Sequence, residues 1–169
     1  MAGLPGAGKS TIAEVVGNRL GYAVLSVDPI ESAILSAGID SDQPTGLAAY
    51  LVAEAIADAA LGNGQAIIVD AVNAVNPARE QWVALAKKHS DSLRFIEVVC
   101  SDVELHRSRI EARGRNLAHL EAPTWHAVEQ SLDEYDEWSG PSAEVERLTL
   151  DSVEPLEVLV DRALSWLES

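Results

Sequence analysis

Short, continuously apolar runs alternate along this chain with longer stretches whose apolar residues recur at helical spacing. The first long stretch places Ile12, Val15, Val16 and Leu20 on one helical face, and Gly21 is positioned to end that helix. The other long stretches predict helices over residues 29–37, 47–61, 77–89, 103–113, 124–135 and 155–167. The apolar runs predict strands over residues 23–27, 66–69, 93–99 and 145–150.

Strands that alternate with helices predict the fold class. Such a pattern is typical of an α/β protein in which helices cover both faces of a parallel sheet. The chain has 169 residues, which is enough for one sizeable core, and it shows no internal repeat, linker or low-complexity segment. We therefore predict a single domain over residues 1–169.

Charge and composition narrow the classes of function. The formal net charge is −15. A nucleic-acid chain would meet a repulsive field over most of such a surface, so the charge favours a small acceptor over nucleic acid. No apolar run reaches the roughly 18 residues of a membrane span, and no secretory signal is present. The lone Cys100 excludes an internal disulfide. These features predict a cytoplasmic protein without a membrane partner.

The most specific motif lies at the beginning of the chain and fits the phosphate-binding pattern G-x-x-x-x-G-K-[ST]. Glycines let the backbone approach a polyphosphate, and the following helix directs its positive end at it. Lys9 is expected to reach the β- and γ-phosphates, and the Ser10 hydroxyl to ligate Mg²⁺. The expected nucleotide-binding residues are Gly3, Leu4, Pro5, Gly6, Ala7, Gly8, Lys9, Ser10 and Thr11.

The same motif normally follows a buried strand, but only Met1 and Ala2 precede Gly3. Two residues do not make a strand. Either a short apolar segment has been lost, or the sheet is built without it. We favour the first alternative and predict a truncated first strand, which the true N-terminus of the native protein would test.

Two of the predicted strands are followed by aspartates, Asp28 and Asp70. Ligands of doubly wound sheets bind beyond the carboxyl ends of the strands, where the P-loop also opens. Asp28 could take the proton of an attacking hydroxyl, and Asp70 could hold the Mg²⁺ shell together with Ser10. The two roles could be exchanged, or the aspartates could merely cap a helix or a turn.

A basic cluster stands out in the otherwise acidic chain. Arg109 and Arg113 are four residues apart on one face of a predicted helix. Their guanidinium groups could clamp the triphosphate and offset the charge that develops during transfer. The alternative is a solvated face in which both arginines pair with acidic side chains.

Together these residues resemble the P-loop kinases of the AAA_33 type, which are related to polynucleotide kinases, zeta toxins and chloramphenicol phosphotransferases. The resemblance spans most of the chain. The segments that carry it are residues 3–11, Asp28, residues 68–73 followed by Asn76-Pro77, residues 109–114, which are similar to the lid of adenylate kinase-like enzymes, and Pro123-Thr124-Trp125 with Tyr135 and Trp138.

The resemblance implies a three-layer fold with a sheet of order 2-3-1-4-5, a lid-like segment around residues 109–123, and ATP with Mg²⁺ as cofactors. It implies catalytic roles for Lys9, Asp28 as the acceptor-side base, and Arg113 near the transferring phosphate, with Arg109 near the adenine. Many relatives carry arginine where this chain has Glu31. An acidic residue there disfavours a phosphate-bearing acceptor and would suit a cationic or polyhydroxylated one.

We therefore predict an ATP-dependent phosphotransferase, a P-loop kinase that moves the γ-phosphoryl group to a hydroxyl of a small molecule. One alternative is a polynucleotide 5′-hydroxyl kinase or a toxin-like kinase of a nucleotide-sugar. Another, from a different class, is an ATP-binding switch protein with little catalysis. The pattern leaves the identity of the acceptor, the choice between ATP and GTP and the oligomeric state open.

Overall fold

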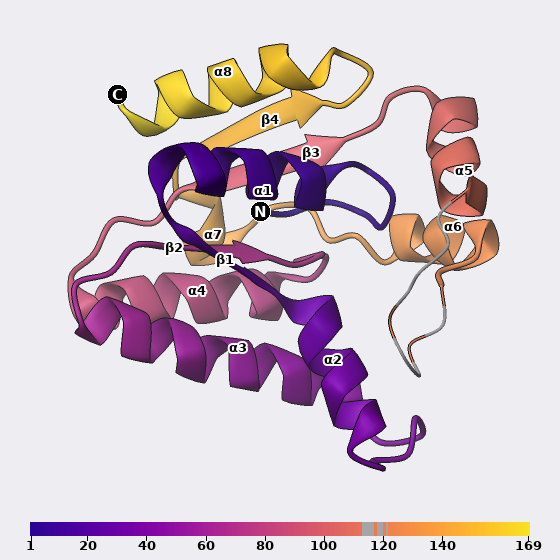
Figure 1. Ribbon diagram of the computed structural model, residues 1–169, viewed down its shortest axis with the longest axis horizontal. Helices are drawn as coiled ribbons and strands as arrows, with labels where there is room; N and C mark the ends of the chain where they lie inside the picture. The colour runs from indigo at the N-terminus through magenta and orange to yellow at the C-terminus, as the bar shows by residue number, and fades with distance from the viewer. Residues whose placement is uncertain (113–116, 118–119, 121) are drawn as a thin grey trace.

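Helices and strands alternate as predicted, and Figure 1 shows the helices on both sides of the strands. The computed structural model describes residues 1–112, 117, 120 and 122–169. The elements are α1 (Lys9–Leu20), β1 (Ala23–Ser26), α2 (Val27–Ser36), α3 (Thr45–Gly62), β2 (Ile67–Asp70), α4 (Asn76–His89), β3 (Phe95–Val99), α5 (Val103–Ala112), α6 (Trp125–Asp133), α7 (Gly140–Ala143), β4 (Arg147–Asp151) and α8 (Leu156–Leu167).

The strands of the described residues pair in parallel, β1 with β2 and β3 with β4. Residues 1–3 lie between the two pairs. Ala2 donates its N–H to the carbonyl oxygen of Ile96 at 2.8 Å and accepts from the N–H of Val98 at 2.9 Å. On the other side, the Met1 amino group donates to the carbonyl oxygen of Val69 at 2.6 Å.

Residues 1–3 therefore occupy the place that the predicted order 2-3-1-4-5 gives to the first strand. They form an isolated bridge, Ala2 opposite Glu97, rather than a strand. The described residues accordingly hold two two-stranded sheets joined by this bridge. A continuous five-stranded sheet of that order stays a prediction, as does the short apolar segment before Met1.

Each side of the strands has its own hydrophobic core, which gives three layers. On one side, Ile12 and Val16 of α1 and Leu159 of α8 pack against Val98 and Leu150 of β3 and β4. On the other side, α3 and α4 pack over β1 and β2. The buried residues of this second core include Ala49, Ala53, Ala57, Trp82 and Leu85. The α/β class is confirmed.

One boundary differs from the prediction in a way that affects the site. β1 ends at Ser26 rather than at Val27, and α2 begins at Val27, so Asp28 lies in the first turn of a helix. Ser26 keeps an extended backbone and forms the N-cap. Pro29 is the third residue of α2, where a missing N–H removes no hydrogen bond within the helix. Asp28 is thereby held just beyond the strand end.

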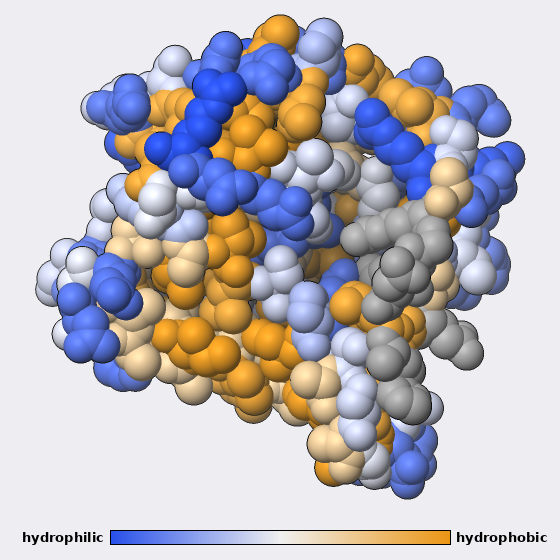
Figure 2. Space-filling view, viewed as in Figure 1, coloured by the Kyte–Doolittle hydropathy of each residue, from blue (hydrophilic) through white to orange (hydrophobic). Residues whose placement is uncertain are grey.

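Figure 2 shows an apolar surface over α3, where Leu47, Leu51, Val52 and Ile56 are exposed. Among the described residues, α3 alone is long and apolar enough to cross a membrane by length and composition. Ala49, Ala53 and Ala57 on its other face are buried against the second core. The helix therefore belongs to the layer that covers β1 and β2.

Candidate nucleotide and acceptor site

The loop of residues 3–8 adopts a conformation that its glycines make possible. Gly3 has φ of 133°, and a Cβ atom there would lie 2.2 Å from the carbonyl oxygen of Val98. Gly8 has φ of 97° and directly precedes α1. Because residue 8 is a glycine, no side chain caps α1, and the N–H groups of its first turn are oriented to bind an anion.

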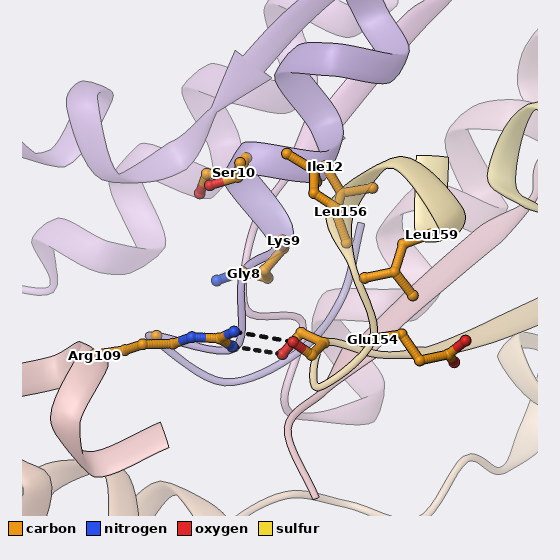
Figure 3. A pocket seen from close by; sticks show the side chains of 11 residues that line it. Gly8, Lys9, Ser10, Ile12, Arg109, Glu154, Leu156 and Leu159 are labelled. Atoms are coloured by element: carbon orange, nitrogen blue, oxygen red, sulfur yellow. Dashed lines mark hydrogen bonds between the residues drawn. The ribbon is translucent and has the colours of Figure 1, made fainter. Parts of the chain in front are cut away.

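A cleft of about 390 Å³ opens at this helix terminus. Lys9 lines it with a side chain that is only 6% exposed, and Ser10 lies beside it. Figure 3 shows Lys9 between Ser10 and Arg109. A cationic amine, a hydroxyl and free helix N–H groups suit the phosphates of a nucleotide. Of the predicted nucleotide-binding residues, those that line the cleft are Gly6, Gly8, Lys9, Ser10, Thr11 and Arg109, whereas Gly3, Leu4, Pro5 and Ala7 are not part of its lining.

Arg109 reaches this cleft from α5 and is held by a residue that the sequence did not single out. Its two terminal nitrogens donate to Ser152, to Oγ at 2.7 Å and to the carbonyl oxygen at 2.9 Å (Figure 3). Ser152 follows β4, and its own N–H donates to the carbonyl oxygen of Val99 at 2.8 Å. The loop after β4 therefore fixes the direction of the guanidinium group.

The P-loop is also tied to α5 through a histidine. His106 is buried, and its Nε2 lies 2.7 Å from the carbonyl oxygen of Pro5. The edge of its ring meets Trp125 at 5.4 Å between ring centroids. Trp125 is partly buried and packs against the hydrophobic cluster of Leu4, Ile110 and Val128.

Asp70 lies at the end of β2 and is 5% exposed. Its Oδ2 accepts from Ser26 Oγ at 3.1 Å, whereas Oδ1 has no hydrogen-bond partner among the described residues. A buried carboxylate oxygen without a partner is costly unless a cation or an ordered water binds it. Carboxylate and hydroxyl oxygens, such as those of Asp70 and Ser10, are the hard donors that Mg²⁺ prefers. These residues fit the predicted metal.

The Met1 amino group lies within electrostatic range of both Asp70 and Lys9. Burial lowers the pKa of this amino group to about 6, while Asp70 raises it and Lys9 lowers it.

Tyr50 of α3 lies near the loop that follows β2, within electrostatic range of Asp28 and Asp70. Burial raises the pKa of Tyr50, and the carboxylates of Asp28 and Asp70 raise it further. The hydroxyl oxygen of Tyr50 accepts the backbone N–H of Asn73 at 3.0 Å. The phenol therefore lies within the field of both aspartates, at the carboxyl ends of β1 and β2.

Asn73 organises the loop after β2. It is buried with a positive φ of 50°, a conformation that costs energy outside glycine. Two side-chain hydrogen bonds offset this cost. The Asn73 side chain accepts from Trp82 Nε1 at 2.9 Å and donates to the carbonyl oxygen of Met1 at 2.8 Å. The loop that carries Asp70 is thereby fixed to α4 and to residues 1–3.

Arg79 of α4 supports the same loop and was missed by the sequence analysis. It is fully buried and donates to the carbonyl oxygens of Asn73, Ala74 and Asp136 at 2.8, 2.7 and 2.9 Å. Its guanidinium group also lies over the Trp138 ring, 4.1 Å from the centroid. One signal could have revealed it, because Arg79 shares the apolar helical face of Trp82 and Ala86.

Two other predicted features have a clear placement. Glu31 accepts a hydrogen bond from Thr45 Oγ1 at 2.8 Å, so it fastens α2 to the start of α3. Trp138 packs edge-on against Phe95. Part of the predicted lid, residues 113–116, 118–119 and 121, lies outside the described residues, and Arg113 is among them. The structure therefore assigns no geometry to the role predicted for Arg113.

The family model AAA_33, described as an AAA domain, matches residues 1–138 of the chain. The match covers the P-loop, both aspartates and the loop after β2. The chain belongs to this family of P-loop proteins. A comparison with curated proteins found no match.

Solved structures with the same fold include several kinases. A sugar kinase from Janibacter sp. is 21% identical, with 99% of this chain and 91% of that chain covered and a TM-score of 0.73. A putative kinase from Chloroflexus aurantiacus is 20% identical, with coverage of 99% and 93% and a TM-score of 0.77. The APS kinase of Mycobacterium tuberculosis, in complex with AMPPNP and APS, is 17% identical, with coverage of 99% and 95% and a TM-score of 0.66. The fold is that of P-loop kinases.

Proposed function

We propose that the protein is an ATP-dependent phosphotransferase that moves the γ-phosphoryl group to a hydroxyl of a small molecule. One observation carries the proposal: Asp28 directly follows β1 and Asp70 ends the paired strand β2, at the sheet edge where the P-loop opens. A binding site for nucleotide alone would need no second carboxylate on the acceptor side. The names of the structural neighbours, a sugar kinase among them, support this class.

Each residue has a role that its position suits. Lys9 and the N–H groups at the start of α1 bind the phosphates, and Arg109, held by Ser152, closes the nucleotide cleft. Ser10 and Asp70 would hold Mg²⁺, which would add positive charge beside the β- and γ-phosphate oxygens. Asp28 orients the acceptor hydroxyl and takes its proton.

In the proposed transfer, the acceptor oxygen forms a bond to the γ-phosphorus. The bond from this phosphorus to the oxygen that bridges to the β-phosphate breaks, and its electron pair stays on ADP. The proton of the acceptor hydroxyl passes to the Asp28 carboxylate. Such catalysis depends mainly on positioning and on electrostatic stabilisation, which the backbone-built P-loop and Lys9 can supply.

The first experiment measures ADP release with MgATP, alone and with pools of aminoglycosides, sugars, nucleosides and 5′-hydroxyl oligonucleotides. A small-molecule pool that raises ADP release above the basal rate supports the proposal. Stimulation by the oligonucleotides alone would favour a polynucleotide kinase instead. Tight ATP binding without stimulation by any pool would favour an ATP-binding switch protein.

The matched variant is Asp28→Asn, which removes the base and keeps the shape. We expect transfer to fall by roughly a hundredfold or more while nucleotide binding, measured by calorimetry, stays intact. Asp40→Asn, an exposed aspartate after α2, serves as the control and should leave both unchanged. Transfer by Asp28→Asn at the rate of the unchanged protein would refute the role of Asp28.

A further inference from the structure

The segments proposed to form the acceptor side contain acidic residues and no basic ones. Residues 20–78 include β1, α2, α3, β2 and the loop that follows β2, and they contain no lysine, arginine or histidine. Their carboxylates are Asp28, Glu31, Asp40, Asp42, Glu54, Asp58 and Asp70. Asp58 is paired with Lys88 and His89 of α4, and the remaining carboxylates would repel an anionic acceptor and attract a cationic one.

The basic residue that follows this segment cannot offset the charge. Arg79 is fully buried, and its guanidinium group is used by the carbonyl oxygens of Asn73, Ala74 and Asp136. Arg109 donates to Ser152 on the nucleotide side. Neither of these two arginines is oriented to hold a phosphate, sulfate or carboxylate group of an acceptor.

Glu31 places a second carboxylate on the side of α2 that carries Asp28. The two residues are three apart in the helix, so they lie on one face. Oε1 of Glu31 accepts from Thr45, and Oε2 has no hydrogen-bond partner among the described residues. This partly buried oxygen can accept a hydrogen bond from a bound group.

Tyr50 supplies the one donor that a reacting hydroxyl needs. Its oxygen already accepts the N–H of Asn73, and its O–H has no acceptor among the described residues. Because burial and the two aspartates raise its pKa, the phenol stays protonated and can donate. An acceptor hydroxyl between Tyr50 and Asp28 would accept from the first and donate to the second.

We propose that the acceptor is a polyol bearing a protonated amine, with its reacting hydroxyl between Asp28 and Tyr50 and its ammonium group bound by Glu31. The inference rests on the phosphotransferase function proposed above and names its substrate class. Hydroxyls match the Tyr50 donor and the Asp28 acceptor. The ammonium group matches the excess of carboxylates and the lack of any basic side chain in residues 20–78.

The test compares three pools that differ in charge: amino sugars with aminoglycosides, neutral sugars with polyols, and sugar acids with sugar phosphates. We expect ADP release with MgATP to be at least tenfold higher with the amine pool than with the neutral pool, and no stimulation by the anionic pool. Equal or better stimulation by the neutral or the anionic pool would overturn this inference and keep the phosphotransferase. No stimulation by any pool would overturn the phosphotransferase itself, and this inference with it.

Variants of Glu31 test the ammonium contact. In Glu31→Gln the side-chain oxygen can still accept from Thr45, so the link to α3 is retained. We expect KM for the amine acceptor that gives the highest rate to rise at least tenfold with little change in kcat, and KM for its neutral analogue to stay the same. Equal changes for both analogues would assign Glu31 a purely structural role and overturn the contact.

Two further variants separate charge from structure. Thr45→Val removes only the hydrogen bond to Glu31, and we expect it to affect amine and neutral acceptors equally. Asp42→Asn removes a carboxylate from an exposed position outside α2, and we expect the preference for the amine to persist. Loss of the preference in Asp42→Asn would show a diffuse effect of net charge and overturn the assignment to Glu31.

Discussion

The nucleotide side and the acceptor side of this site are built in opposite ways. The nucleotide side uses consecutive residues 3–11, whose backbone forms the binding surface, and adds Lys9 and Arg109 as cations. The proposed acceptor side takes Asp28 from α2 and Tyr50 from α3, two elements distant in sequence from the P-loop. A site made of backbone is visible as a motif, whereas a site made of distant side chains is defined only by their packing.

The largest effect is expected on the nucleotide side. Lys9→Ala should reduce transfer by at least roughly a hundredfold, because it removes a preorganised cation from the developing charge. Steady-state ADP release measures the loss, with circular dichroism to verify the fold. Lys88→Ala, an exposed lysine on α4, is the control. Near-normal turnover of Lys9→Ala would contradict the assigned role.

On the acceptor side, substitution of the supporting residue Arg79 should lower the stability of the folded protein. Arg79→Met removes one donor from each of three backbone carbonyl oxygens, of which that of Ala74 keeps the N–H of Asp136, and we expect a loss of about 3 kcal/mol or more in the free energy of unfolding. Denaturation by urea measures it. Arg162→Met, which breaks an exposed pair with Glu154, should cost less than about 1 kcal/mol. Equal losses in both variants would show that the Arg79 network contributes little.

A smaller effect, on KM, distinguishes the nucleotide side from the acceptor side. Arg109→Met removes the guanidinium group from the nucleotide cleft, and we expect KM for ATP to rise about tenfold, as for the loss of one charge-assisted contact. KM for the acceptor should stay the same. Substrate-saturation kinetics, with the concentrations of ATP and of the acceptor varied in turn, provide the measurement. A rise in KM for the acceptor alone would contradict the placement of Arg109 at the nucleotide cleft.

The smallest effect concerns pH. Burial alone would raise the pKa of Asp151, but hydrogen bonds from Ser101 and Val153 together with Arg109 leave it lowered. Because its pKa is lowered by folding, ionised Asp151 stabilises the folded state at a pH above its pKa in the unfolded chain, which is near 4. This stabilisation is lost as the pH falls through its pKa in the folded protein. Asp151→Asn should therefore be less stable than the unchanged protein at pH 7, and the gap should close in denaturation experiments as the pH falls through the pKa of folded Asp151. A constant gap over this range would exclude a charge effect.

Much of the fold followed from pattern, with errors where elements meet. Apolar spacing located the long helices and the strands, and Gly21 does end α1 with a left-handed conformation. The end of β1 was wrong by one residue, because the sequence does not show that Val27 and Asp28 already belong to α2. The short helix α7 was not predicted, since four residues carry no periodic signal.

The candidate site divides in the same way. Lys9 and Ser10 were found because their roles depend on neighbours in sequence. Asp28 and Asp70 were predicted because both stand next to a strand end, where the structure places them, and their roles stay predictions. Ser152 and Tyr50 were missed, because nothing near a lone serine or a tyrosine within an alanine-rich helix shows which remote side chain it will meet.

The sequence by itself determined the family, the α/β class and the nucleotide side, because glycine conformations and a helix terminus are properties of a few adjacent residues. It also determined the absence of basic residues from 20–78, which sets the charge of the acceptor side. Only the tertiary structure decided that Tyr50 lies within the electrostatic field of the two aspartates. It also decided that the guanidinium group of Arg79 donates its hydrogen bonds to the loop after β2. Those contacts depend on how α3 and α4 pack across the strands, and packing is a property of the whole core.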